Sequence, residues 1–329
     1  MKKILGVLLL GLLIAGCSSR PKVEDDAAAL RQAALVDAPE TFVFADPDKG
    51  GPVITVLEQG AEPRRALRYV FQPGQADTMV FDMIMNMKTS MAGMSLMDIK
   101  MPLTRMKAAL DIAEVARDGS CRYRARYFAI DVIPDEDTDP NFMAVYEPEI
   151  RKMVGLEVNG VITARGHQPQ LETVIPEGMP PDLQGNLEQM EQSMQNMAVP
   201  FPQEALGLGA QWSVFMPVDV NNLKGSQTAT YELMEWMKDG VRLSLGLLQD
   251  FPAQSIQSPD LPEGTTVSLE NCDSSVQGFM TVDFLRLVPQ AGMVSDMLMD
   301  TVIDGMGMTQ QMQMEMQMDV NIYGAEMLP

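Results

Sequence analysis

Methionine is the residue type whose spacing most directly suggests chemistry in this chain of 329 residues, which contains 30 methionines. Two segments place thioethers at every second position: Met83-x-Met85-x-Met87, and the ladder Met312, Met314, Met316 and Met318. Paired thioethers can bind Cu(I), but the same spacing puts side chains on one face of a β-strand. The single histidine, His167, does not provide the imidazole partners common at copper sites. Cu(I) binding is therefore a remote alternative to an apolar strand face.

Three aspartates at alternate positions imitate the first ligands of a calcium-binding loop: Asp135, Asp137 and Asp139. Such a loop needs a glycine at its sixth position and a bidentate glutamate at its twelfth. Pro140 and Tyr146 occupy those two positions, so the match fails twice. We expect a solvated acidic turn here and predict no metal site.

Acid–base chemistry has few candidate residues. His167 lies in the loop-like segment Arg165-Gly-His-Gln-Pro169, and neither a G-x-S-x-G motif nor a paired cysteine accompanies it. Glu114 and Glu235 occupy matching places before two Asp-Gly pairs and could act as an acid pair. Each lies near the end of its predicted strand, where a carboxylate reaches water more readily. We therefore predict no catalytic residue and no cofactor, and we expect that the protein is not an enzyme.

The N-terminus has the three-part pattern of an export signal. A basic start, Met1-Lys2-Lys3, precedes an aliphatic run from Ile4 to Ile14 and the small residues Ala15 and Gly16. At about 1.5 Å per residue, a helix over 4–16 would span about 20 Å, which is short of the roughly 30 Å hydrocarbon core of a bilayer. We predict that residues 1–16 are a signal peptide that is removed.

The tetrapeptide Ile14-Ala15-Gly16-Cys17 resembles the lipobox of bacterial lipoproteins. The resemblance implies a diacylglyceryl thioether on Cys17, cleavage before it, and acylation of the new amino group with a fatty acid such as palmitate. Several acyl chains anchor a protein firmly, since each buried methylene contributes about 0.8 kcal/mol. Ser18 and Ser19 follow in place of an aspartate, which points to the outer membrane. The lipid on Cys17 would anchor a domain that faces the periplasm.

Charge and composition bound the exported part. The chain has 24 basic and 45 acidic residues, and removal of residues 1–16 takes away Lys2 and Lys3 only, which leaves a net charge of −23. This charge disfavours binding to nucleic acid. Residues 17–166 contain 18 basic and 23 acidic residues, whereas residues 167–329 contain 4 and 22. The uneven charge suggests two halves, and a hydrophobic content of 46% provides for a sizeable core.

Alternation of apolar and polar residues is the strongest structural signal. From Met308 to Ile322 the even-numbered positions are mostly methionine, valine or isoleucine, and the odd-numbered positions are polar. A second long strand is predicted from Met79 to Met91. At about 3.3 Å per residue, sixteen residues extend about 50 Å, far beyond the usual strand. Strands of this length predict long, curved antiparallel sheets in a mainly β (α+β) protein.

Two Asp-Gly pairs predict β-hairpins with two-residue type I′ turns. Around Asp118-Gly119, the predicted register places Ala116 opposite Cys121 and Glu114 opposite Tyr123 on a dry face. The wet face then pairs Asp111 with Arg126. Asp239-Gly240 repeats the pattern 121 residues later, with several matching residues around it. We therefore predict two related halves.

The predicted second hairpin has two apolar faces. Tyr231, Leu233, Gly246 and Leu248 lie on one, and the other has Met234, Trp236, Leu243, Leu245 and Leu247. Such a hairpin must be covered on both sides, line a cavity, or expose a patch to a partner. One or two amphipathic helices are expected to provide the cover.

Helix signals occur in three segments. Asp182 is a suitable N-cap for an amphipathic helix that reaches Met197, and further helices are expected over 142–154 and 289–304. Asn159-Gly160 predicts a third, shorter hairpin. The expected organisation is a signal peptide (1–16), a lipidated acidic tether (17–51), an N-terminal β half (52–180), a helical connection (181–200) and a C-terminal β half (201–329).

The segment Gly60-Ala-Glu-Pro-Arg-Arg-Ala-Leu-Arg-Tyr69 resembles the start of the folded region in a family of uncharacterised bacterial lipoproteins. The resemblance covers this short segment, with a looser pattern of long strands behind it. It implies an envelope location and a mostly β domain. Because that family has no established activity, the resemblance assigns no functional residue.

Cys121 and Cys272 are the two cysteines that remain after lipidation of Cys17. Export delivers them to an oxidising compartment. A disulfide between them is one prediction, and a pair of buried free thiols is the other.

Two functions from different classes remain open. The leading hypothesis is a non-catalytic structural or partner-binding lipoprotein, whose tether presents the domain to a periplasmic protein. The alternative is a carrier or sensor of a lipid-like apolar small molecule, held on a methionine-lined sheet face. The residues predicted to form that face are Met312, Met314, Met316, Met318, Trp236 and Leu245.

Overall fold

The computed structural model describes residues 52–174, 198–220, 223–256, 265–305 and 308–327. Within these ranges the protein is mainly β, as predicted, with one α-helix and two short 3-10 helices. The signal peptide, Cys17, the tether and the predicted helix from Asp182 to Met197 lie outside the described residues.

The elements are numbered in chain order. The strands are β1 (Val53–Glu58), β2 (Ala61–Arg65), β3 (Ala76–Met91), β4 (Met94–Lys100), β5 (Leu103–Val115), β6 (Cys121–Ile133), β7 (Glu157–Ile162), β8 (Gln170–Val174), β9 (Leu206–Leu208), β10 (Gln211–Val220), β11 (Leu223–Trp236), β12 (Gly240–Asp250), β13 (Gln254–Ile256), β14 (Thr266–Asp283), β15 (Gln290–Gly305) and β16 (Met308–Gly324). The helices are α2 (Pro140–Ile150), η4 (Arg151–Met153) and η5 (Ala325–Met327).

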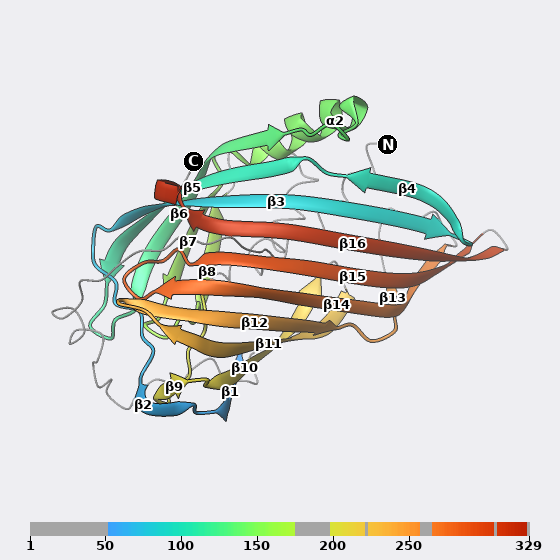
Figure 1. The fold of residues 1–329 in the computed structure, drawn as a ribbon. Coiled ribbons are helices and arrows are strands. Elements are labelled where there is room, and N and C mark those ends of the chain that lie inside the picture. The colour runs from blue at the N-terminus through green and yellow to red at the C-terminus, as the bar shows by residue number, and fades with distance from the viewer. Residues whose placement is uncertain (1–51, 175–197, 221–222, 257–264, 306–307, 328–329) are drawn as a thin grey trace.

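One antiparallel sheet of 14 strands contains nearly all of the β structure (Figure 1). Its order is β1-β10-β11-β12-β14-β15-β16-β3-β5-β6-β7-β8, with β4 beside β3 and β13 beside β14. β2 and β9 form a separate pair. Because β16 pairs with β3, strands from both predicted halves meet in the middle of a single sheet.

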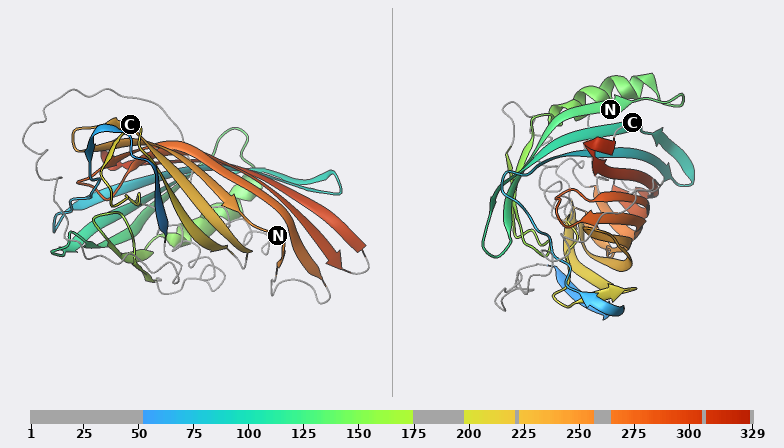
Figure 2. Two further views of the ribbon diagram at one scale, coloured as in Figure 1. Left: turned by 90° about the horizontal axis from the view of Figure 1, so that it is seen from below. Right: turned by 60° about the vertical axis from the view of Figure 1, so that its left-hand side comes forward.

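The sheet is strongly curved and wraps around an interior (Figure 2). Side chains from strands far apart in the sheet order belong to one hydrophobic core, for example Tyr123 on β6, Leu233 on β11 and Val320 on β16. We call the side that bears this core the inner face and the opposite side the outer face.

The two longest predicted strands are confirmed. β16 turns its even-numbered residues inward, with Met318 and Val320 buried, and exposes Glu315 on the outer face. β3 runs antiparallel to it, with Met85 opposite Met318 and Met83 opposite Val320. The alternating pattern therefore predicted both strands and the face that each turns toward the core.

Aromatic side chains fill one end of the inner face. The ring of Phe201 lies 5.2 Å from that of Tyr69, 5.9 Å from that of Phe284 and 6.3 Å from that of Trp212. Trp212 also stacks on Tyr231 at 5.3 Å. We call this the closed end; the other end, where β3 turns into β4 and β15 into β16, is the strand-tip end.

The first Asp-Gly hairpin joins β5 to β6, but its turn differs from the prediction. The amide of Ala116 donates to the carbonyl of Ser120 (2.8 Å), and the amide of Gly119 donates to the carbonyl of Ala116 (3.0 Å). Gly119 has a φ of 80°. The loop thus has three residues with glycine in the left-handed position, a common alternative to the two-residue turn.

This turn and a bulge after Ile112 shift the predicted register. Val115, not Ala116, lies opposite Cys121. Glu114 lies opposite Arg122 on the outer face, and their side chains are 3.4 Å apart. The prediction that Glu114 lies on the dry face was wrong because a bulge adds one residue and reverses the side-chain direction beyond it. The same shift pairs Asp111 with Arg124 at 3.1 Å in place of Arg126.

The second hairpin, β11–β12, has its own bulge between Leu233 and Glu235. Its turn is centred on Lys238 and Asp239, since the amide of Met237 donates to the carbonyl of Gly240 (2.9 Å). The bulge lies 121 residues after that of the first hairpin. This match agrees with a relation between the two halves, which stays a prediction.

The prediction of two apolar faces in this hairpin was wrong. Tyr231 lies opposite Leu245, and Leu233 opposite Leu243, and all four side chains are buried on the inner face. The outer face exposes Leu248. The predicted register had divided one apolar face between two sides of the sheet.

α2 confirms the helix predicted over 142–154. The Asp139 carboxylate caps it by accepting a hydrogen bond from the amide of Asn141 (2.8 Å). Tyr146 and Ile150 are buried in the core. The hydroxyl of Tyr146 lies 2.9 Å from Oγ1 of Thr104 on β5, so α2 packs against the inner face there.

Two further predictions were wrong. Most of the segment predicted as a helix over 289–304 forms β15, which pairs along its length with β14 and β16. Asn159-Gly160 lies inside β7 and forms no turn. A Cβ on Gly160 would lie 2.6 Å from the ring of Tyr123, so glycine is needed here for close approach to a ring.

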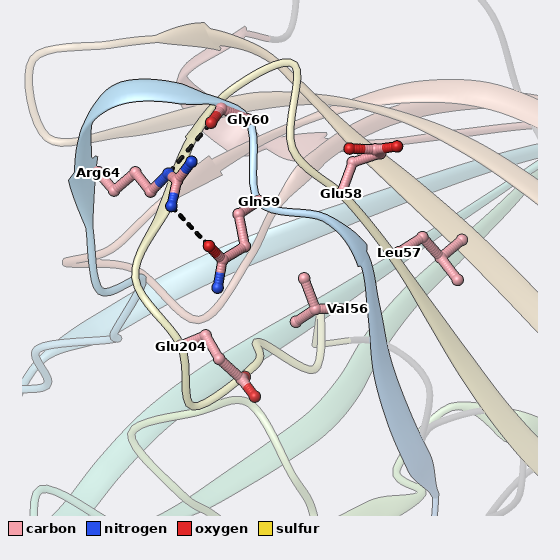
Figure 3. A pocket seen from close by; sticks show the side chains of 7 residues that line it. All are labelled: Val56, Leu57, Glu58, Gln59, Gly60, Arg64 and Glu204. Atoms are coloured by element: carbon pink, nitrogen blue, oxygen red, sulfur yellow. Dashed lines mark hydrogen bonds between the residues drawn. The ribbon is translucent and has the colours of Figure 1, made fainter.

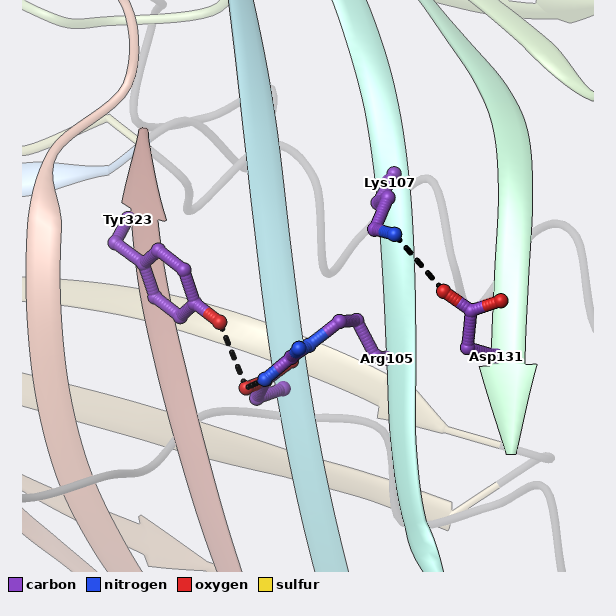
Figure 4. A network of polar contacts seen from close by, with 5 residues as sticks. Arg105, Lys107, Asp131 and Tyr323 are labelled. Carbon is purple, nitrogen blue, oxygen red and sulfur yellow. Dashed lines mark hydrogen bonds and ion pairs between the residues drawn. The ribbon is translucent and has the colours of Figure 1, made fainter. Parts of the chain in front are cut away.

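A polar network on the outer face connects three central strands (Figure 4). Arg105 on β5 donates twice to the Asp82 carboxylate on β3, at 2.7 and 2.6 Å. The hydroxyl of Tyr323 on β16 donates to the same carboxylate at 2.8 Å. The bond to Asp82 raises the pKa of the Arg105 guanidinium. Beside this network, Lys107 pairs with Asp131 at 2.9 Å.

Candidate functional site

Methionines line the inner face toward the strand-tip end. Met316 on β16 lies directly opposite Met87 on β3 and, on its other side, directly opposite Met297 on β15. Two residues closer to the tip of β16, Met314 lies directly opposite Met299 on β15. Two residues further along, Met312 lies directly opposite Met91 on β3. Directly opposite residues have Cβ atoms about 4.5–5.5 Å apart, so these thioethers adjoin one another. Thr89 on β3 and Thr301 on β15 are the inward neighbours of Met314 and Met312, respectively.

We call this surface the methionine face and define it by Met87, Met91, Met297, Met299, Met312, Met314 and Met316. Met87 and Met299 are buried, whereas the other five are only partly buried. Deeper rows, such as Met83 with Val320 and Met85 with Met318, are fully buried. The inner face thus changes from a filled core at the closed end to a partly accessible surface toward the tips.

A second, smaller hydrophobic cluster adjoins the methionine face. It contains Leu223, Leu269, Cys272 and Met299, and Met297 and Met314 pack against it. Cys272 lies directly opposite Met299. The sulfur atoms here come from thioethers and one protonated thiol, since burial raises the pKa of Cys272 to about 11.

A short polar row continues the methionine row across the sheet. Ser274 lies directly opposite Met297, and Gln249 and Gln227 follow on β12 and β11. The Ser274 hydroxyl donates to Oε1 of Gln249 at 2.9 Å, and Nε2 of Gln249 donates to Oε1 of Gln227 at 3.1 Å. This row was not predicted from the sequence; its signal is polar residues at inward positions of otherwise apolar strands.

Inward-facing positions around these rows are uncharged. On β15 they run from Ala291 to Ile303, and on β16 from Gln310 to Ile322. The inward positions of β3 from Met79 to Met91, and the described inward positions of β11, β12 and β14, are also uncharged. The acidic residues of β15 and β16 lie on the outer face instead.

The predicted ligand residues are only partly brought together. Met312, Met314, Met316 and Met318 share the inner face of β16. Leu245 is buried deeper, between Tyr231 and Gly278. Trp236 lies at the closed end of β11, with the Arg65 guanidinium 5.2 Å from its ring centroid, and so does not adjoin the methionine face.

The predicted disulfide between Cys121 and Cys272 is absent, since both are free, buried thiols. Cys121 lies on β6 near the closed end and Cys272 on β14, with β15, β16, β3 and β5 between them in the sheet. A disulfide requires Cα atoms within about 7 Å. Burial raises the pKa of Cys121 to about 12.

The pocket in Figure 3 is a polar alternative to the methionine face. It has a volume of about 500 Å³ and lies beside the edge strand β1. Arg64 supplies its positive charge, but Nε of Arg64 donates to the carbonyl of Gly60 at 3.1 Å, and the guanidinium also contacts Gln59. Its carboxylates are Glu58 and Glu204. Arg64 thus holds its own loop, and the described residues that line the pocket include no serine, threonine, cysteine, histidine or lysine.

The other candidate groups are His167 and the acidic turn at Asp135 to Asp139. His167 is buried, and burial together with the nearby Arg165 lowers its pKa, which favours a neutral imidazole. Asp135 accepts a hydrogen bond from Thr138 within its turn, and Asp137 pairs with Lys100. The described residues contain no group of three or more His, Cys, Asp or Glu side chains arranged to hold a metal ion.

Comparison with models of known protein families gives no match for this chain, and comparison with curated proteins gives none either. No helix among the described residues is long and apolar enough to cross a membrane. A proposal for function therefore rests on the geometry of the inner face and on the N-terminal sequence.

Proposed function

We propose that the protein is a lipid-anchored envelope lipoprotein that carries a lipid-like, apolar molecule on its methionine face. The observation that carries this proposal is the partial burial of five adjoining methionines on the inner side of a curved sheet. A structural or partner-binding role without a ligand was the leading hypothesis from sequence; the accessible apolar inner surface favours the carrier instead.

Energetics support a ligand at this position. Burying a methionine fully contributes about 1.5–3 kcal/mol relative to leaving it exposed, so partly buried thioethers can gain free energy when an apolar chain covers them. Methionine side chains are unbranched and adapt to ligands of varied shape. The uncharged inward positions of β15 and β16 remove the desolvation cost that a charged lining would add.

The location of the carrier rests on the sequence. The pattern ending at Cys17 resembles a lipobox, and the acidic, proline-containing stretch from Ser18 to Gly51 would separate the domain from the membrane. Facing the periplasm at the outer membrane, such a domain would meet lipids and acylated molecules of the envelope. The resemblance of residues 60–69 to an uncharacterised lipoprotein family agrees with this location.

The test is a titration of the mature chain without its lipidated cysteine, residues 18–329, with a polarity-sensitive fluorescent acyl methyl ester. We expect a saturable increase in fluorescence. Met314→Glu and Met316→Glu should each weaken binding strongly, because a carboxylate would enter the apolar surface. Gln311→Glu adds the same charge to the exposed outer side of β16 and should bind like the unmodified protein.

Two results would end the proposal. One is the absence of a saturable signal with the unmodified protein. The other is equal binding by folded Met314→Glu and by the Gln311→Glu control, since the methionines would then serve the core alone.

A further inference from the structure

The polar row beside the methionine face places polar side chains at buried inward positions. Gln227 is only 2% exposed and Ser274 only 7% exposed. The inward neighbours of this row toward the closed end are Ala229, Leu247 and Val276, which are also buried. Apolar residues thus serve at equivalent places in the same strands. Burying amide and hydroxyl groups is unfavourable unless they are hydrogen-bonded.

The row also keeps unused hydrogen-bonding capacity. Gln227 accepts a bond from Gln249 through Oε1, and within the described part of the chain its side-chain nitrogen has no acceptor. Ser295 on β15, only 5% exposed, likewise has no side-chain partner in the described ranges. It lies between Met318 and Val276 on the inner face, next to the Ser274–Met297 pair. Donors therefore face the interior at the border of the methionine face.

From this arrangement we propose that Gln227, Ser274 and Ser295 bind an uncharged, hydrogen-bond-accepting group of an amphiphile, such as an acyl ester, whose chain lies on the methionine face. The inference rests on the proposed function and names its ligand class. The carbonyl of the ester would accept from the Gln227 amide, and the hydroxyls of Ser274 and Ser295 continue the polar surface from there toward the methionine face.

The absence of charge decides between ligand classes. The described inward positions of β11, β12 and β14 to β16 offer no basic side chain to a carboxylate or phosphate. An anion buried there would lose its hydration without gaining a counter-charge. A pure hydrocarbon would leave the Gln227 amide without an acceptor, which is also unfavourable. An ester satisfies the donors and introduces no charge.

The experiment compares competitors of one chain length for the fluorescent ester bound to residues 18–329. The competitors are a methyl ester, a monoacylglycerol, the free fatty acid at pH 8 and the alkane. We expect the two esters to displace the probe at concentrations about tenfold or more below those of the acid and the alkane, as one well-made hydrogen bond allows.

Two variants test whether Gln227 causes the preference for the ester. Gln227→Leu should remove the preference for the ester over the alkane while alkane binding persists. Gln277→Leu makes the same change at an exposed position of β14 and should keep the preference. As a readout that does not depend on affinity, the carbonyl stretch of a ¹³C-labelled ester bound to the unmodified protein should lie at lower wavenumber than in an alkane solvent. When the ester is bound to Gln227→Leu, the stretch should lie close to the alkane value.

The outcomes are distinguishable. Equal displacement by ester, acid and alkane, or a carbonyl stretch of the bound ester at its position in alkane, would overturn the assignment of the polar row and leave the carrier function standing. A preference for the free acid would also overturn it. Absence of saturable binding by every competitor and by the probe would overturn both proposals.

Discussion

Cys272 lies directly opposite Met299 on the inner face, and its thiol is free. The sulfur atom therefore belongs to an apolar cluster with thioethers and not to a cross-link with Cys121. Burial raises the pKa of both thiols, to about 11 for Cys272 and about 12 for Cys121. Since the thiolate is the reactive form, both cysteines should be inert in the folded protein.

Thiol labelling tests this arrangement. The folded chain of residues 18–329 should take up no maleimide at pH 7. After denaturation without a reductant it should take up two labels per chain, because no disulfide has to be broken. A chain that gains its labels only after reduction would show that the two cysteines are linked.

A second prediction concerns the close contact between Gly160 and Tyr123. Gly160→Ala should lower the free energy of unfolding by about 2–4 kcal/mol, because the new Cβ would lie 2.6 Å from the ring and the ring is held by a 2.6 Å bond from its hydroxyl to Gln168. Gly246→Ala is the matched control within a strand, since a Cβ there meets nothing within 4 Å. Urea denaturation measures both; equal effects would contradict the contact.

The outer-face network gives a third prediction. Asp82→Asn should lower the free energy of unfolding by about 1–3 kcal/mol, because the largely buried carboxylate accepts from both Arg105 and Tyr323. Glu114→Gln removes one partner of an exposed pair with Arg122. It should lower the free energy of unfolding by less than about 1 kcal/mol. A similar loss in both variants would show that the network does not hold β16, β3 and β5 together.

A fourth prediction concerns alkaline pH. Burial raises the pKa of all six tyrosines, to about 12 for Tyr127 and Tyr323. The folded state therefore holds phenolic protons that the unfolded chain loses near pH 10. The contribution of the protonated tyrosines to the free energy of unfolding is complete below pH 10. It is lost as the pH rises through 10 toward 12 and above. Tyrosinate absorbance should appear together with unfolding, and its appearance at pH 10 in a folded protein would contradict the burial.

The strands could be predicted from sequence because their side chains alternate over long distances. Met312 to Met318 face inward as expected, and β3 runs where Met79 to Met91 predicted. Segment 289–304 was predicted as a helix, although Met293, Ser295, Met297 and Met299 also alternate along it. Pairing with strands on both sides decides its conformation, and such long-range pairing is not encoded in local spacing.

Register was harder to predict than strand position. A bulge adds one residue to one strand, and the bulge after Ile112 moved Glu114 from the predicted dry face to the outer face. The bulge after Leu233 likewise pairs Glu235 with Arg242. The Asp118-Gly119 pair gave the position of the turn but not its length. In both hairpins, an error of one residue reversed the assigned faces.

The candidate site was predicted in part. The methionine ladder of β16 was identified, but its partners Met87, Met297 and Met299 could be placed beside it only once the strand order was known. Gln227, Gln249 and Ser274 were overlooked because they lie on three strands and become neighbours through pairing alone. No local motif joins them.

The central claim is that the inner face holds a lipid-like molecule in the cell envelope, and native mass spectrometry of the protein purified from its own membrane tests it most directly. The account predicts that the native mass exceeds the denatured mass, which includes any lipid on Cys17, by that of one uncharged acyl ester. Met314→Glu should lack this additional mass, and Gln311→Glu should retain it. Identical native and denatured masses, or a difference that corresponds to a bound protein, would contradict the account.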